Sequence, residues 1–177
     1  MRLLPLGRGV HGNLRIAPRW PSRAVTVNSE VLEQLQAIQA NLPAAIGLIV
    51  TRGFEARATK LGGARRLFRA LGIRLFALCY PRRRDEIGDI FGANGHDTDG
   101  THVDVSFCLA GKRVRMLPLG VFTPPAWQRR CVARHAGHLA RIREAMEAAG
   151  FRLHRNATES LQMHLDYVPR GATSILP

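Results

Sequence analysis

The sequence predicts an α+β fold in a single domain, with a small central antiparallel sheet and helices packed mainly on one face. Three stretches predict the central strands. Apolar and polar residues alternate strictly from His102 to Leu109, which is typical of a half-buried strand. The stretch Leu161–Val168 also alternates, and Ala45–Thr51 is a short apolar run of strand length. A chain of 177 residues that is 46% hydrophobic suits one domain with a filled core.

Composition divides the chain into three segments. Residues 1–27 are rich in Gly, Pro and Arg, and we expect an irregular N-terminal arm with a short strand around Leu14–Ile16 or Ala24–Val27. Residues 28–170 form the predicted α+β domain. Residues 171–177 are expected to be a C-terminal tail.

The helices of the first half follow from capping and breaking residues. Asn28 or Ser29 can cap a helix with apolar residues at helical spacing, and Pro43 ends it. After the buried strand, Leu61–Leu71 is predicted to be a second helix because a glycine follows at its C-terminal end. The apolar stretch Ile73–Tyr80 is then predicted to be a strand.

The second half of the chain adds one long helix and two shorter strands. After a short turn, Val114–Leu119 can return as an antiparallel strand. The longest helix begins at Thr123-Pro124-Pro125, since proline suits the first turn of a helix, and Gly150 closes it. Phe151–His154 begins the final pair of strands.

The polar faces of two predicted strands carry side chains that bind metals. His102 and Asp104 point the same way from the first strand, and His96 lies just upstream. His164 and Asp166 share a face of the last strand. Imidazole and carboxylate groups are common zinc ligands. We therefore expect the two strands to lie side by side and to share a metal, with His102 and His96 as competing ligands.

The charge of the chain is strongly positive. Its formal net charge is +13, and Lys60 and Lys112 are the only lysines, so arginine supplies nearly all of it. This indicates an anionic partner, such as nucleic acid, a membrane surface or an acidic cell-wall polymer, or else a compositional bias spread over solvated faces. No aromatic residues interleave with the arginine clusters, which are Arg65-Arg66, Arg82-Arg83-Arg84 and Arg129-Arg130.

No targeting or membrane segment is expected. No apolar run approaches the roughly 20 residues needed to span a bilayer, and the N-terminal stretch is too short and too soon interrupted for a signal peptide. We therefore expect a cytoplasmic protein as the chain is written. Action outside the cytoplasm would require release or processing.

Four motifs occur in an order similar to that of a known family. They are Val50-Thr51-Arg52-Gly53-Phe54-Glu55-Ala56-Arg57, Gly95-His96 through Asp104, Ala145-Met146-Glu147-Ala148-Ala149-Gly150-Phe151 and His164-Leu165-Asp166-Tyr167. This order resembles the zinc D-Ala-D-Ala carboxypeptidases and dipeptidases and the related peptidoglycan L,D-endopeptidases of phage lysins. The resemblance covers most of residues 28–168. It implies the hedgehog/D-Ala-D-Ala peptidase fold and hydrolysis of peptidoglycan stem peptides or similar short D-amino-acid peptides.

The resemblance also implies a site. It assigns His96, Asp104 and His164 as Zn²⁺ ligands, while from periodicity alone His102 competes with His96, since His102 and Asp104 share a face of the strand. Three protein ligands leave the fourth zinc position for water. The remaining expected roles are Glu159 as general base, Arg57 or Arg52 as a clamp for the oxyanion or the peptide carboxylate, and Ser106 and Asp166 as substrate contacts, with Asp166 also an alternative base.

The sequence departs from the family pattern at three positions. One extra residue separates His96 from Asp104, so that His102 stands at the family's small residue. Glu55 replaces the family's arginine, and Leu161 replaces its catalytic glutamate. Two alternatives therefore stay open. One is a family member that retains metal but has lost hydrolysis and serves as a binding module, and the other is an arginine-rich nucleic-acid-binding domain.

Overall fold

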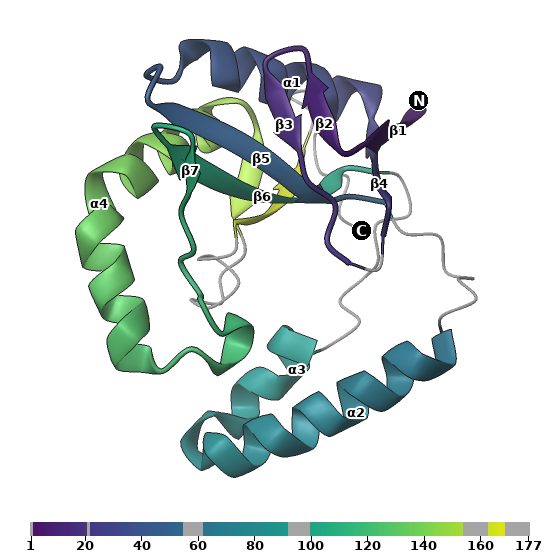
Figure 1. Ribbon diagram of the computed structural model, residues 1–177, viewed down its shortest axis with the longest axis vertical. Coiled ribbons are helices and arrows are strands. Elements are labelled where there is room, and N and C mark those ends of the chain that lie inside the picture. Colours follow the sequence, from purple (N-terminus) through teal and green to yellow (C-terminus); the bar gives the residue numbers. More distant parts are fainter. Residues whose placement is uncertain (1, 21, 55–61, 92–99, 154–162, 169–177) are drawn as a thin grey trace, which may run out of the picture.

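The computed structural model describes residues 2–20, 22–54, 62–91, 100–153 and 163–168, and these form an α+β fold (Figure 1). The main sheet has the strand order β2-β3-β5-β6-β9-β8, with β7 paired to β6. Their bounds are β2 Gly9–His11, β3 Leu14–Ile16, β5 Ile46–Arg52, β6 His102–Leu109, β7 Lys112–Arg113, β8 Phe151–Leu153 and β9 His164–Tyr167. A separate antiparallel pair is formed by β1 (Leu3–Gly7) and β4 (Ala24–Asn28). The α+β class is therefore confirmed.

The main sheet is mixed rather than wholly antiparallel. Strand β3 pairs with β5 in parallel, whereas the pairings of β5 with β6, β6 with β9 and β8 with β9 are antiparallel. Parallel neighbours need a long connection. Here β4 and helix α1 (Ser29–Asn41) supply it between β3 and β5.

The N-terminal segment is more regular than the sequence indicates. Both short strands expected there are present, as β3 and β4, and β1 and β2 are added. Leu6, Leu14 and Val25 from this segment are buried in the main core. The expected irregular arm is thus part of the folded domain, because pairing with distant segments compensates for its weak local strand signal.

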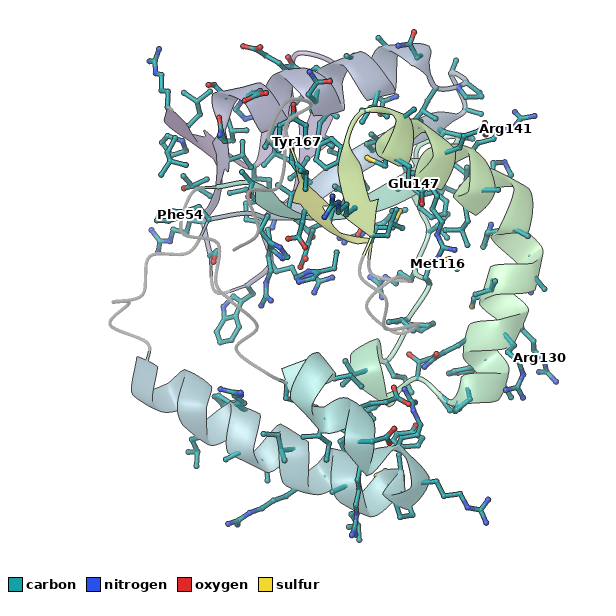
Figure 2. All side chains as sticks on the ribbon, turned by 180° about the vertical axis from the view of Figure 1, so that it is seen from behind. Phe54, Met116, Arg130, Arg141, Glu147 and Tyr167 are labelled. Atoms are coloured by element: carbon teal, nitrogen blue, oxygen red, sulfur yellow. The ribbon has the colours of Figure 1, made fainter. Side chains whose placement is uncertain are left out.

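Two helices cover the apolar face of the sheet. Helix α1 begins as predicted, with the Asn28 side chain accepting a hydrogen bond from the Glu30 backbone N–H at 3.0 Å. Helix α4 spans Pro125–Ala148. The two helices share one core with β6, and its members include Val31, Leu35 and Ile38 from α1, Leu139, Ile142 and Met146 from α4, and Val103, Val105 and Phe107 from β6. On the outer side of α4, Arg130 and Arg141 point away from the sheet (Figure 2).

Helix α2 (Gly62–Cys79) corrects two expectations. The helix predicted at Leu61–Leu71 does not end before Gly72, and the predicted strand Ile73–Tyr80 is wrong, because the helix continues through Gly72 to Cys79. Helical spacing of the apolar residues persists across this glycine. A Cβ at Gly72 would lie 3.1 Å from the Phe91 ring, so glycine lets that ring approach the helix backbone.

The 3₁₀ helix η1 (Pro81–Glu86) and helix α3 (Ile87–Phe91) complete this part of the molecule. It stands apart from the sheet at the bottom of Figure 1. None of the described residues of α2 or α3 belongs to the main core. Of the helices that the structure describes, none has both the length and the apolar character required to cross a membrane.

The segment after β6 also differs from prediction. The strand that returns along β6 is β7, only two residues long, and the expected strand Val114–Leu119 is absent. The Val114 N–H still bonds the Phe107 carbonyl at 2.9 Å, after which the chain leaves the sheet. Pro118, which has no N–H to donate to a ladder, lies in this segment. The segment then reaches the 3₁₀ helix η2 (Gly120–Phe122) before α4.

Candidate metal centre

Pairing of β6 with β9 brings the predicted ligand residues together. In the antiparallel register, His102 lies opposite Asp166, and Asp104 lies opposite His164. Side chains at alternate positions of paired strands share a face of the sheet. The expectation that these two strands lie side by side is confirmed. They place two imidazoles and two carboxylates on one face, opposite the face that packs on α1 and α4.

Three ligand atoms converge at this point, and we call the residues that carry them, His102, Asp104 and His164, the cluster. His102, Asp104 and His164 each offer one ligand atom, and these atoms lie within 4.8 Å of one another. The Nε2 atom of His102 is 3.1 Å from Nδ1 of His164, which also hydrogen-bonds Oδ1 of Asp104. In tetrahedral zinc sites the metal–nitrogen distance is about 2.0–2.1 Å, so two ligand nitrogens lie about 3.3 Å apart. The donor set and this spacing fit a metal bound by two histidines and one carboxylate.

Asp166 orients one of the imidazoles. Its Oδ1 accepts a hydrogen bond from Nδ1 of His102 at 2.6 Å, which leaves Nε2 of His102 directed at the cluster. A carboxylate behind a histidine is a common arrangement in metal sites, where it fixes the ring and its tautomer. Asp166 is therefore placed to position His102, and its expected roles as substrate contact or alternative base stay predictions.

Asp104 is a buried carboxylate that is held ionised. Its residue is 3% exposed, and burial by itself would raise its pKa. The hydrogen bond and charge of His164, together with the positive charges of Arg19 and Arg52, outweigh burial and bring the pKa of Asp104 below its ordinary value. An ionised carboxylate is the form that binds a cation.

Arg19 reaches the site through backbone pairing. Beyond β3, the Ala17 N–H bonds the Val50 carbonyl at 2.9 Å and the Arg19 N–H bonds the Thr51 carbonyl at 3.2 Å. The chain thus follows β5 to its end, and Nη1 of Arg19 lies 3.9 Å from Oδ2 of Asp104. Burial lowers the pKa of Arg19, and the neighbouring Asp104 charge partly offsets this effect.

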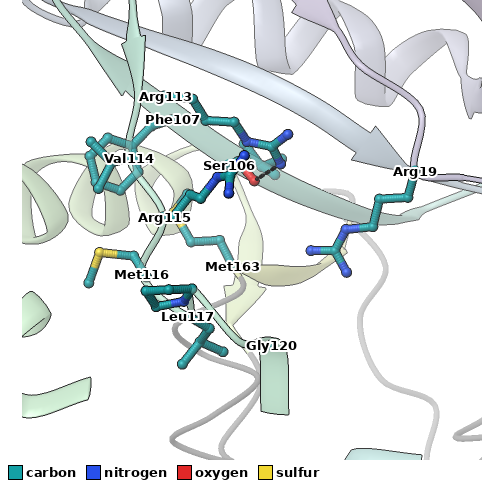
Figure 3. Close-up of a pocket in the computed structure, with 12 residues that line it drawn as sticks. Arg19, Ser106, Phe107, Arg113, Val114, Arg115, Met116, Leu117, Gly120 and Met163 are labelled. Carbon is teal, nitrogen blue, oxygen red and sulfur yellow. Dashed lines mark hydrogen bonds between the residues drawn. The ribbon is translucent and has the colours of Figure 1, made fainter. Parts of the chain in front are cut away.

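A pocket of about 340 Å³ lies next to the cluster, and we call it the arginine pocket. Figure 3 shows Arg113 and Arg115 on one side of it and Arg19 approaching from the other. Nη2 of Arg113 donates to Ser106 Oγ at 2.9 Å. No described residue lining the pocket is acidic, and burial, followed by repulsion from Arg19 and Arg115, lowers the pKa of Arg113. Such a pocket is suited to an anionic group of a ligand.

The structure describes six of the nine residues expected in the site. It brings together His102, Asp104 and His164, with Asp166 behind them, and Ser106 lines the neighbouring pocket. Arg52 ends β5, pairs in register with Asp104 and is exposed. The other three, His96, Arg57 and Glu159, lie outside the described residues.

Sequence reasoning missed the arginines of the pocket. Arg113 and Arg115 follow the turn after β6 at alternate positions, a spacing that could have identified them as neighbours on one side of the chain. No comparable pattern in the sequence identifies Arg19 as a neighbour of the site. Its position depends on the parallel pairing of β3 with β5, and the sequence does not reveal that pairing.

Comparison of this chain with protein-family models, with curated proteins and with solved structures finds no match.

Proposed function

We propose that the protein is a zinc-dependent hydrolase of amide bonds in short peptides, with peptidoglycan stem peptides as the substrate class. The observation that carries this proposal is the convergence of His102 Nε2, His164 Nδ1 and Asp104 Oδ1 beside the arginine pocket. A bound zinc would lower the pKa of a coordinated water to about 7 and polarise a substrate carbonyl. The order of the sequence motifs supports a peptide as the substrate.

Each residue of the site would have a distinct role in metal binding or in hydrolysis. His102 and His164 would hold the metal as neutral imidazoles, and Asp104 would supply a negative charge. Asp166 would keep His102 oriented through the bond at its Nδ1. Glu159 remains the predicted general base. It would take a proton from the attacking water and deliver it to the leaving amine.

The arginine pocket supports the proposal that the substrate carries a negative charge near the bond to be cut. Guanidinium groups pair with carboxylates through parallel N–H bonds, and partial burial strengthens such pairs. The apolar part of its lining, which includes Met116, Leu117 and Met163, would contact small aliphatic side chains. A short peptide with a free carboxylate combines both features.

The direct test measures zinc content and hydrolysis together. We expect about one zinc per chain by elemental analysis and cleavage of short peptides that end in D-alanine, with faster cleavage of free-acid than of C-terminally amidated peptides. His102→Ala should lose the zinc, and His96→Ala should retain it. Zinc loss in His96→Ala alone would instead support the ligand set implied by the family resemblance. Failure of the wild type to take up zinc would refute the proposal of a zinc-dependent hydrolase.

Asp166→Ala should weaken zinc binding by about 10- to 100-fold without removing a ligand, because the ring of His102 would lose its orienting carboxylate. Competition with a chromophoric zinc chelator would measure the dissociation constant. Asp85→Ala is a matched control, since Asp85 is an exposed carboxylate in η1. Equal zinc affinity in Asp166→Ala and Asp85→Ala would show that Asp166 does not position the ligand.

A further inference from the structure

One side of helix α2 exposes a row of large apolar side chains. Their exposed fractions are Leu67 69%, Phe68 67%, Leu71 60%, Leu75 46% and Leu78 77%. Because successive residues of an α-helix are about 100° apart, these five fall within a stripe roughly 100° wide. We call this the α2 stripe. Burying such side chains in an apolar environment is favourable. A continuous apolar stripe exposed to water therefore indicates a surface that binds a partner molecule or a membrane.

The α2 stripe is not the side by which the helix attaches to the protein. That side carries Phe76, which is fully buried. Its ring lies 5.1 Å from the ring of Tyr80, 5.7 Å from that of Phe91 and 6.0 Å from that of Phe122. The Tyr80 hydroxyl donates to the Phe122 carbonyl at 2.6 Å, which joins the end of α2 to η2. The helix is thus held by its opposite side.

The charge of α2 indicates what the stripe contacts. The helix sequence contains Arg65, Arg66, Arg69 and Arg74 and no aspartate or glutamate. Arg69 and Arg74 are exposed, and Arg74 falls beside Leu78 and Leu67 at the edge of the stripe. Exposed Arg82 and Arg84 follow in η1. Arg69 falls on the other side of the helix, so of Arg69 and Arg74 only Arg74 borders the stripe. An apolar stripe on a helix whose only charged residues are basic is the pattern of helices that lie in the interface of an anionic membrane.

We propose that α2 binds the surface of an anionic lipid bilayer. The α2 stripe enters the boundary between headgroups and acyl chains, Arg74 at its edge contacts a lipid phosphate, and the net positive charge of the helix attracts it to the anionic surface. The helix lies along the surface, since it lacks the apolar character required to cross it. Charge disfavours a second copy of the chain as the occupant, because two such helices would bring their arginines together without an acidic residue on either.

Vesicle co-sedimentation of the full chain tests this proposal. The wild type should sediment with vesicles of phosphatidylglycerol and phosphatidylcholine in equal parts, and much less with phosphatidylcholine alone. Binding should weaken at about 0.5 M NaCl, where surface charges are screened. The double variant Leu71→Gln/Leu75→Gln should bind about tenfold or more weakly, because two apolar contacts are lost. Val10→Gln, at a residue 74% exposed on β2, should bind like the wild type.

Other results would overturn the proposal. These are equal binding to both kinds of vesicle, an unchanged affinity in the double variant, or a wild-type dimer in sedimentation velocity that the double variant dissociates. Circular dichroism and thermal unfolding would verify the fold of each variant. Should the double variant fail to fold, Leu78→Gln tests the same stripe at its most exposed residue, and Arg74→Gln tests the charge.

Discussion

His164→Ala should lower kcat/KM for hydrolysis of a D-alanine-terminated peptide by about a thousandfold or more. His164 is the residue through which β9 contributes to the cluster, and its Nδ1 contacts both His102 and Asp104. Without it, one histidine and one carboxylate would remain. The loss of a metal contribution of several kcal/mol corresponds to a rate change of this size.

The design of this experiment separates loss of metal from loss of fold. His138→Ala is the matched control, because His138 is an exposed histidine on α4, and its rate should equal that of the wild type. Zinc content and circular dichroism would be measured on the same samples. A folded His164→Ala protein with wild-type activity would exclude His164 from the active site. A zinc-loaded wild type without peptidase activity would leave the metal centre in place and favour the binding-module alternative.

Phe151→Ala should lower the free energy of unfolding by about 3–5 kcal/mol. Phe151 is 2% exposed, and its ring lies 5.1 Å from that of Tyr167 on the neighbouring strand. The Tyr167 hydroxyl in turn donates to Glu30 of α1 at 2.8 Å. Removing the ring would therefore leave a cavity beside Tyr167 in the main core that the surrounding residues can fill only in part.

Urea unfolding followed by circular dichroism would measure this difference. Leu119→Ala is the control, because Leu119 is 57% exposed and little burial is lost there; its effect should stay within about 0.5 kcal/mol. Phe151 belongs to the main core, away from the cluster. The folded fraction of Phe151→Ala should thus still take up zinc. A loss of stability below about 1 kcal/mol would show that the neighbouring side chains close the cavity.

The sequence predicted the strands of the site well because both signals are local. Strict alternation placed β6 at His102–Leu109, and the shorter β9 falls within the predicted segment. Alternation also determines which side chains share a face, so the cluster could be anticipated once the two strands were assumed to pair.

The remaining features depend on contacts between distant segments or on an ambiguous local pattern. Arg19 approaches Asp104 only because the chain after β3 follows β5 in parallel. The strand predicted at Ile73–Tyr80 fails because short apolar runs fit a helix as well as a strand, and the helical spacing before Gly72 continues after it. Tertiary pairing therefore decides the position of Arg19, whereas the helix through Gly72 follows a local spacing that a short apolar run leaves ambiguous.

The position of β9 in the strand order has a consequence for the timing of assembly. Strand β9 lies between β6 and β8, and β8 joins the sheet through β9. Of the described strands, β9 is the last to leave the ribosome. Strand β8 is therefore synthesised before β9, its pairing partner. His102 and Asp104 are likewise synthesised about 60 residues before His164, so the three side chains can come together only after β9 has been made. A cation that bridges β6 and β9 would consequently stabilise a strand pairing that can form only after His164 has been synthesised.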